Sequence, residues 1–145
     1  MEFKEVVWKR RSVRDFDANR LVDEKDIKYL LEAGTQAPSS GNSQCWRFFV
    51  VQNNAVKNDL VSAALGQHFI AKAPVVIVVC ADIGHMKRQY GKRGVDTYAL
   101  QDTSAAVENI LLAAADRGLG TCWVGAFDES LASRALDIPQ AIRPV

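Results

Sequence analysis

Residues 73–82, with the sequence APVVIVVCAD, form a nearly continuous apolar run with many β-branched residues and with Pro74 near its start. The run falls well short of the roughly 18 apolar residues that a membrane helix needs. A strand without alternating polar residues is typical of a strand that is buried on both faces of a sheet. The sequence therefore predicts an internal strand here, in a chain whose 145 residues are enough for one domain.

The other elements are predicted from periodicity and from capping residues. Apolar residues at helical spacing, with Asp23 and Asp128 as N-caps and Gly118 after a C-terminus, predict helices over residues 2–11, 23–33, 58–65, 93–117 and 129–136. Aromatic and β-branched residues predict strands over residues 46–52 and 121–127, and residues 142–145 are also strand-like. Two polar stretches, residues 38–44 and 83–92, are predicted to be loops, the second with a helical turn.

The composition narrows the kinds of partner. Eighteen basic and 17 acidic side chains give a formal net charge of +1, so no overall field would hold a nucleic acid or an anionic membrane. The three cysteines, Cys45, Cys80 and Cys122, are odd in number and widely spaced, as in proteins with reduced thiols. Residues 1–11 contain no apolar stretch ahead of a cleavage site. We expect a soluble, cytoplasmic protein that binds neither nucleic acid nor membrane.

One stretch, KRRSVRDF at residues 9–16, concentrates positive charge. Guanidinium groups and a hydroxyl near a helix end suit a phosphate dianion, which they would bind through charge-assisted hydrogen bonds. The candidate residues are Arg10, Arg11, Ser12 and Arg14. The alternative is a solvated basic helix end with no ligand.

Two further stretches could contact a polar or flat ligand. The loop at residues 38–44 could present side chains and backbone N–H groups to a polar edge; its candidate residues are Pro38, Ser39, Ser40, Asn42 and Gln44. Gly125 lies within GLGTCWVGAF, and a glycine there would let the strand backbone approach a flat ligand. An ordinary connection and a packing glycine are the respective alternatives.

No side chain stands out as an acid, a base or a nucleophile. The sequence has no Ser-His-Asp, HExxH, P-loop or GxGxxG pattern. His68 and His85 are not spaced as a ligand pair, so we expect no metal and assign them as surface or satisfied histidines. Cys80 and Cys122 are most simply small buried hydrophobes. Ligand-binding features without catalytic side chains indicate that a cofactor carries the chemistry.

Four motifs in order resemble the nitroreductase family of FMN-dependent oxidoreductases: RRSVRDF, APSSGNSQCWRF, QDTSAAVENILLAA and GLGTCWVGAF. The resemblance spans nearly the whole chain. It implies an α+β fold with a central mixed sheet surrounded by helices, and an obligate homodimer with two FMN sites at the interface. It also implies ping-pong electron transfer from NADH or NADPH through the flavin to nitroaromatic, quinone or similar acceptors.

The same resemblance assigns roles by position. Arg10, Arg11, Ser12 and Arg14 match the segment that holds the phosphate and the pyrimidine edge of the flavin. The loop residues Pro38, Ser39, Ser40, Asn42 and Gln44 match a loop that often reaches the flavin from the partner subunit. Trp123, Val124 and Gly125 match the stretch whose backbone lies at the flavin N5 and O4 edge. Catalysis would belong to the flavin, which the protein positions and tunes.

The sequence departs from the family pattern at two places. Cys45 stands where the family usually has proline, and we assign it no redox role. Family members usually continue past the strand at residues 142–145 into a segment that packs on the partner and often adds a basic residue to the phosphate site. We therefore expect one domain over residues 1–145 that lacks this segment, so that the N-terminal arginines hold the phosphate largely by themselves.

Alternatives to a nitroreductase activity remain open at this point. One is a relative that uses reduced flavin for reductive dehalogenation or flavin fragmentation, and another is a non-catalytic flavin-binding dimer. The acceptor is not encoded in any motif. A basic group between the second predicted strand and the long helix could attract a nicotinamide phosphate or an acidic acceptor, although a solvated loop is the favoured interpretation; it comprises Lys87, Arg88, Lys92 and Arg93.

Overall fold

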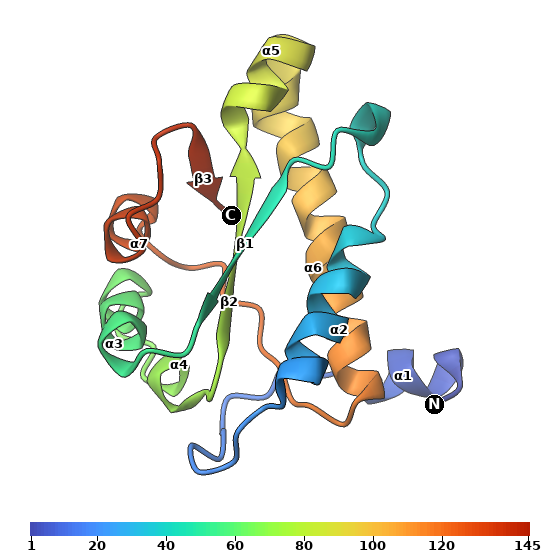
Figure 1. The fold of residues 1–145 in the computed structure, drawn as a ribbon, viewed down its shortest axis with the longest axis vertical. Helices are drawn as coiled ribbons and strands as arrows, with labels where there is room; N and C mark the ends of the chain where they lie inside the picture. The colour runs from blue at the N-terminus through green and yellow to red at the C-terminus, as the bar shows by residue number, and fades with distance from the viewer.

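The computed structural model describes all 145 residues. Its centre is a three-stranded antiparallel sheet with the strand order β1–β2–β3 (Figure 1). The strands are β1 (Trp46–Val51), β2 (Val76–Asp82) and β3 (Ile142–Pro144). β1 pairs with six residues of β2, whereas β3 pairs only with the last three, Cys80, Ala81 and Asp82. The strand predicted from the apolar run is therefore the middle strand of the sheet.

Helices cover both faces of the sheet (Figure 1). One face carries α2 (Glu24–Thr35) and α6 (Ala99–Asp116), and the other carries α3 (Asn54–Ala63), α4 (Phe69–Lys72) and α7 (Glu129–Ala135). Ile77 and Val79 of β2 pack toward α2 and α6, while Val76 and Val78 pack toward the other three helices. Because alternate residues serve opposite apolar layers, the strand shows no polar alternation.

The alanine-rich helix α6 packs closely against α2. Ala106 and Ala114 are fully buried, and a Cβ atom on Gly34 of α2 would lie 3.0 Å from Ile110 Cδ1. α6 ends as predicted at Gly118, which has φ +70°. The N–H of Gly118 donates to the carbonyl of Ala115 and the N–H of Leu119 to that of Ala114, the pair of bonds that defines a Schellman cap.

The structure corrects the region before α6. Residues 83–92 were predicted to be a loop, but they belong to the helix α5 (Ile83–Arg93), which begins where Asp82 accepts a hydrogen bond from the His85 N–H. A π-helical turn, η2 (Gly94–Tyr98), then leads into α6, so the single helix expected over residues 93–117 is divided. α5 projects from the end of the molecule, and most of its residues are polar. The sequence therefore shows no apolar stripe at helical spacing in this region.

Other boundaries shift for local reasons. α3 begins at Asn54 rather than at residue 58, because the Asn53 side chain caps it by accepting from the Val56 N–H. The four-residue helix α4 was not predicted. Asp23 and Asp128 are N-cap residues as expected, and the Asp128 side chain accepts from Leu131 N–H. No helix of the chain is long and apolar enough to span a bilayer.

The predicted N-terminal helix is present as α1 (Phe3–Lys9), but most of its apolar side chains are not covered. Val6 is buried, whereas Phe3 is 72% and Trp8 76% exposed. The N-terminal amine of Met1 pairs with the carboxylate of Asp116 at the end of α6, at 3.0 Å. The whole arrangement is the α+β fold that the resemblance implies. The three strands of the sheet are antiparallel, and the parallel pairing is a single bridge outside the sheet, between Ser12 and Thr121.

Candidate functional site

The basic segment after α1 runs in extended form across the chain that follows α6. Arg10 is the C-cap of α1, and Ser12 forms the parallel bridge with Thr121. The Val13 N–H donates to the Thr121 carbonyl at 2.7 Å. A Cβ atom on Gly120 would lie 3.1 Å from the Val13 side chain, so the glycine allows this close crossing. The segment is thus fixed against residues 120–121 by backbone contacts.

The arginines of this segment have no partner within the chain. Val13 faces inward, and Ser12 and Arg14 are exposed on the segment's outer side. Arg10 is half-buried and Arg11 exposed, and none of the three guanidinium groups makes a hydrogen bond or an ion pair. Unpaired guanidinium groups next to a hydroxyl form a donor set that suits a phosphate group.

Residues 121–127 are not a strand, which corrects the prediction. Only Thr121 takes part in any β pairing, through its bridge with Ser12. β3 pairs with β2 and not with this stretch. Trp123 is 45% exposed. A Cβ atom on Gly125 would meet nothing within 4 Å, so this is no packing glycine within the chain, and its backbone is open to a ligand.

The polar loop at residues 38–44 is held by a buried carboxylate that the sequence analysis did not select. Asp102, which is 5% exposed, accepts hydrogen bonds from Ser40 N–H and Oγ, both at 3.0 Å, and from Ser43 Oγ at 3.1 Å. The Tyr90 hydroxyl donates to the Ser40 carbonyl at 3.1 Å. Asp102 is the only acidic residue of the QDTSAA stretch, where it lies among hydroxyl residues and alanines. This was the signal that could have selected it from the sequence.

The loop backbone is unusual as well as anchored. The short 3-10 turn η1 (Ser40–Asn42) contains Gly41 at φ +54°, and Asn42 and Gln44 have φ values of +55° and +48°. Left-handed backbone at residues other than glycine is uncommon and persists where the surroundings hold it. Gln44 Nε2 donates to Asn42 Oδ1 at 2.9 Å, and the Gln44 N–H donates to Ser39 Oγ at 3.0 Å. Both amide side chains are exposed.

The structure brings two of the three candidate groups together. Ser12 in the arginine segment pairs with Thr121, two residues before Trp123 in the stretch that follows α6. The loop from Pro38 to Gln44 lies at the other end of that helix, on Asp102 (Figure 1). α6 has 18 residues, which corresponds to a length of about 27 Å. Within one chain, therefore, the loop does not reach the arginine segment.

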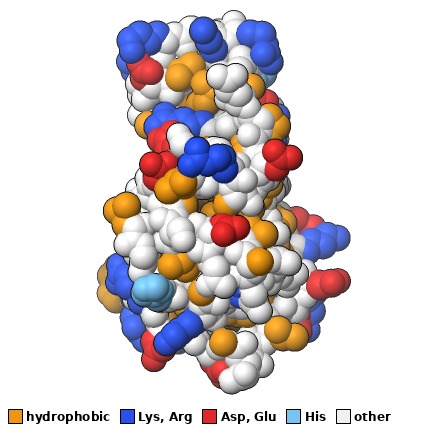
Figure 2. Space-filling model, turned by 90° about the vertical axis from the view of Figure 1, so that its left-hand side faces the viewer, with side chains coloured by type: hydrophobic (Ala, Val, Ile, Leu, Met, Phe, Trp, Pro, Cys, Tyr) orange, Lys and Arg blue, Asp and Glu red, His pale blue; other side chains and the backbone are white.

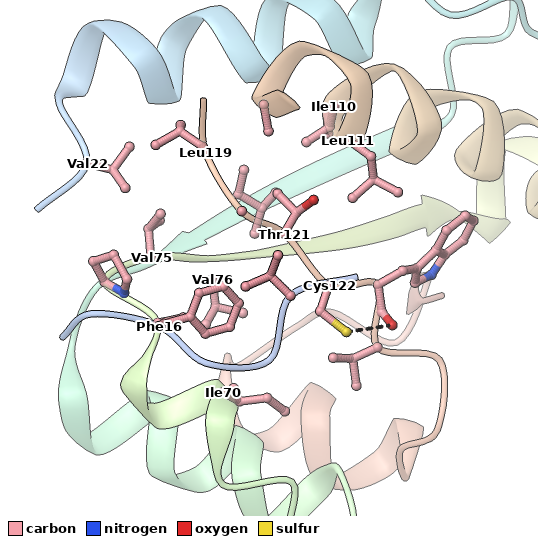
Figure 3. Close-up of a pocket in the computed structure, with 18 of the residues that line it drawn as sticks. Phe16, Val22, Ile70, Val75, Val76, Ile110, Leu111, Leu119, Thr121 and Cys122 are labelled. Carbon is pink, nitrogen blue, oxygen red and sulfur yellow. Dashed lines mark hydrogen bonds between the residues drawn. The ribbon is translucent and has the colours of Figure 1, made fainter. Parts of the chain in front are cut away.

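An apolar cavity adjoins the stretch at Trp123 and Val124. It has a volume of about 410 Å³, and 26 of its 33 lining residues are hydrophobic. Trp123 and Val124 belong to its wall, but Gly125 and the three arginines do not. Figure 3 shows Ile110 and Leu111 of α6 on one side of it and Ile70 of α4 on the other. The charged residues of this lining are Asp15, Asp17 and Arg20, all from the loop between α1 and α2, and the remainder is mostly apolar.

The cysteines and histidines add no reactive group. Cys45 and Cys80 are fully buried; burial raises the pKa of the Cys45 thiol to about 11, with a smaller effect of Asp102, and that of Cys80 to about 12. Cys122 is only half-buried, and its Sγ donates to the Trp123 carbonyl (Figure 3). We predicted that His85 would be a surface or a hydrogen-bonded histidine, but its buried Nε2 atom has no hydrogen-bond partner. No three metal-ligating side chains cluster.

The basic group near α5 is partly engaged within the chain. Figure 2 shows Lys and Arg side chains gathered at the end of the molecule that α5 forms. Lys92 pairs with Asp96, and Arg93 Nε donates to the Tyr98 hydroxyl at 3.1 Å while its guanidinium lies over that ring. Lys87 and Arg88 are exposed and unpaired, as solvated side chains would be.

Comparison with known proteins identifies the family. A model described as the nitroreductase family matches residues 7–68 and 55–145. The chain is 36% identical over 135 residues to a candidate NADH dehydrogenase/NAD(P)H nitroreductase of Archaeoglobus fulgidus, covering 93% of this chain and 74% of that protein. A protein of the same name in Methanothermobacter thermautotrophicus is 33% identical over 127 residues, 88% of this chain and 62% of that protein.

A solved structure agrees with these matches. The nitroreductase family protein of Clostridium novyi superposes with a TM-score of 0.89 at 32% identity, over 100% of this chain and 81% of that chain. The family model covers all four motifs from Arg10 to Phe127. The chain belongs to the nitroreductase family of oxidoreductases.

Proposed function

We propose that the protein is an FMN-dependent oxidoreductase, which passes electrons from NADH or NADPH to a nitroaromatic, a quinone or a similar acceptor by a ping-pong mechanism. The observation that carries this proposal is the set of three unpaired guanidinium groups and a hydroxyl on a segment that is bridged to Thr121, four residues before the open position at Gly125. When bound there, FMN would supply the redox chemistry, accepting a hydride from the nicotinamide and releasing electrons to the acceptor.

The arginine segment would bind the phosphate. Arg10, Arg11 and Arg14 need not break any existing ion pair to do so. The backbone bond between Val13 and Thr121 holds the segment in place before a ligand arrives, which reduces the entropy lost on binding. A guanidinium near the pyrimidine ring would also favour negative charge on that ring.

The stretch Trp123–Gly125 would offer its backbone to the flat ring system. The space on the Cβ side of Gly125 is open, so a planar group could lie against the main chain there. A backbone N–H group directed at the ring could donate a hydrogen bond at the reacting edge. The apolar wall formed by Trp123 and Val124 would limit access of water to that side.

A homodimer would complete the site. The loop from Pro38 to Gln44 lies about one helix length from the arginines, so a second subunit is the natural source of its exposed amides. Apolar side chains of α1 are available for such an interface, since Phe3, Val7 and Trp8 are all exposed. We further propose a cytoplasmic location, in keeping with three free cysteines.

The proposal is tested by FMN titration of single variants, followed by the change in flavin fluorescence. Arg14→Ala and Arg10→Ala should weaken FMN binding about tenfold or more, because each removes a charge-assisted bond to the phosphate. Ser12→Ala should weaken it less. Lys9→Ala is the matched control, since Lys9 is also cationic and unpaired but lies within α1.

Three results separate this function from its alternatives. Unchanged FMN affinity in both arginine variants would contradict the assignment of the segment. FMN binding without reduction by NADH or NADPH would indicate a non-catalytic flavin-binding dimer. Reduction without rapid reoxidation by nitro compounds or quinones would indicate a relative that uses reduced flavin for another reaction.

A further inference from the structure

Tyr90 of α5 contacts the main chain of the loop at residues 38–44, and both lie at the upper end of α6 in Figure 1. Its hydroxyl donates to the Ser40 carbonyl at 3.1 Å, and the Ser43 N–H donates to the same oxygen at 3.0 Å. The Ser40 N–H is held from the other helix, α6, by Asp102. Two helices therefore grip the peptide groups on either side of one residue, and Tyr90 binds the carbonyl that closes the turn.

Gly41 allows the Tyr90 hydroxyl to approach the loop this closely. A Cβ atom on Gly41 would overlap the hydroxyl oxygen and would lie 3.3 Å from Cζ of the same ring. Gly41 also has φ +54°, a left-handed conformation that glycine adopts without steric cost. The glycine thus meets two requirements at once, the backbone conformation of the turn and the space for the hydroxyl. The loop and α5 fit together at the hydroxyl group itself.

The Tyr90 ring is held in place within the chain. It packs edge-to-face on Tyr98 of η2, with ring centroids 5.4 Å apart and an interplanar angle of 86°. Tyr98 is fixed in turn by Arg93, whose Nε donates to the Tyr98 hydroxyl at 3.1 Å. Both rings pack against a buried cluster formed by Cys45, Ala81, Met86 and Ala99. Because the ring is already ordered, its hydroxyl can fix the loop at little further cost in entropy.

The contact lies next to the two exposed amide side chains of the loop. Asn42 and Gln44 follow Ser40 by two and four positions, and both have left-handed backbone, with φ +55° and +48°. Such a conformation persists where the surroundings hold it. The two amides also bond to each other at 2.9 Å, so they are expected to move together. Loss of the Tyr90 contact would therefore release the backbone that directs both amides.

We propose that Tyr90 is a positioning residue for the flavin, whose hydroxyl holds the loop in the conformation in which Asn42 and Gln44 face the FMN of a second subunit. The effect on FMN rests on the function proposed above, whereas the effect on the loop depends only on contacts within this chain. Tyr90 acts through the loop, and no contact between Tyr90 and the flavin is required. A hydrogen bond between neutral groups corresponds to about a threefold to tenfold change in an equilibrium, which sets the size of the expected effects.

The test compares Tyr90→Phe with Tyr98→Phe as a matched control. Each variant removes one hydroxyl from the same pair of rings, but only the Tyr90 hydroxyl bonds to the loop. Without FMN, the Ser43 amide should exchange its hydrogen about threefold to tenfold faster in Tyr90→Phe and at the natural rate in Tyr98→Phe. In titration, Tyr90→Phe should weaken FMN binding by a similar factor and change the visible circular dichroism of the bound flavin, and the control should change neither.

A second pair of variants tests the fit between Tyr90 and Gly41. Gly41→Ala introduces a Cβ atom that overlaps the Tyr90 hydroxyl, so it should weaken FMN binding about tenfold or more. In the double variant with Tyr90→Phe the overlapping oxygen is absent, and FMN binding should recover about threefold or more relative to Gly41→Ala alone. A recovery of this kind separates the position of the hydroxyl from a general loss of stability, because two independent losses would add.

Four results would overturn the proposal. An unchanged Ser43 amide in Tyr90→Phe would show that the hydroxyl does not hold the loop, and equal effects of the two Phe variants would show that the rings act by packing alone. A faster amide with unchanged FMN binding and circular dichroism, or no recovery in the double variant, would show that the hydroxyl does not position the flavin. A natural protein that bound no FMN would instead overturn the proposed function, and the role of Tyr90 toward the flavin with it.

Discussion

Replacement of Asp102 should loosen the loop at residues 38–44 and lower the stability of the fold. The buried carboxylate accepts from the backbone and hydroxyl of Ser40 and from the hydroxyl of Ser43, at 3.0–3.1 Å. Hydrogen bonds to a charged acceptor contribute about 1.5–3 kcal/mol each, but the two half-buried hydroxyls can turn to water when their acceptor is lost. We expect Asp102→Ala to lower the free energy of unfolding by about 2–4 kcal/mol.

A second substitution, Asp102→Asn, removes the negative charge of the side chain but keeps its shape. In Asp102→Asn the amide oxygen can still accept the two Ser40 bonds, and the Ser43 hydroxyl can rotate to accept from the amide nitrogen. The free energy of unfolding of this variant should therefore fall by a smaller amount, about 1–2 kcal/mol. Glu108→Ala on the exposed side of the same helix is the control and should change stability by less than about 0.5 kcal/mol.

The assay combines urea denaturation with hydrogen exchange. Exchange of the Ser40 amide should increase in Asp102→Ala, because that N–H donates to the carboxylate. Removal of the buried carboxylate also recovers its desolvation cost, which acts on the free energy of unfolding in the opposite direction to the lost hydrogen bonds. A variant as stable as the natural protein, with an unchanged Ser40 amide, would therefore refute the anchoring role of Asp102.

Four further predictions concern Gly94, Gly125, Cys122 and Asp116. Gly94→Ala should lower the free energy of unfolding by about 2 kcal/mol or more, because its Cβ atom would lie 2.5 Å from a backbone carbonyl oxygen. Gly125→Ala should leave urea denaturation unchanged but weaken FMN binding in titration. A thiol reagent at pH 8 should modify Cys122 well before Cys45, whose burial raises its pKa to about 11; mass spectrometry of timed samples would show the opposite order if the fold were wrong here. The bond between the N-terminal amine and Asp116 lowers the pKa of the carboxyl and raises the pKa of the amine. Protection of α1 against hydrogen exchange should therefore fall when the pH drops below the pKa of Asp116 and again when it rises above the pKa of the amine. Asp116→Asn should abolish both changes.

Features with a local cause were predictable from the sequence. The apolar run of β2 has one explanation, burial on both faces, and Gly118 ends α6 because a left-handed residue is needed there. The basic segment and the glycine-bearing stretch were selected as candidates because their residue types are unusual for their surroundings, and their role in binding stays a prediction. Their proximity, in contrast, arises from the single bridge between Ser12 and Thr121, which no local pattern encodes.

Features that depend on tertiary neighbours were mispredicted or missed. The stretch at residues 121–127 has the composition of a strand, but a strand also needs a partner, and β3 pairs elsewhere. α5 was taken for a loop because most of its side chains face water, so only Met86 marks its buried side. Asp102 was overlooked because its role requires the loop at residues 38–44, which lies about 60 positions earlier in the sequence.

The central claim is that this chain binds FMN at the arginine segment and uses it to carry electrons. The most direct measurement is the visible absorption of the FMN-loaded protein during anaerobic addition of NADH or NADPH, followed by a quinone or a nitroaromatic compound. The account predicts that the flavin bands disappear with the nicotinamide and return with the acceptor, and that Arg14→Ala retains little flavin. A protein that stays colourless after incubation with FMN and removal of the excess would contradict it.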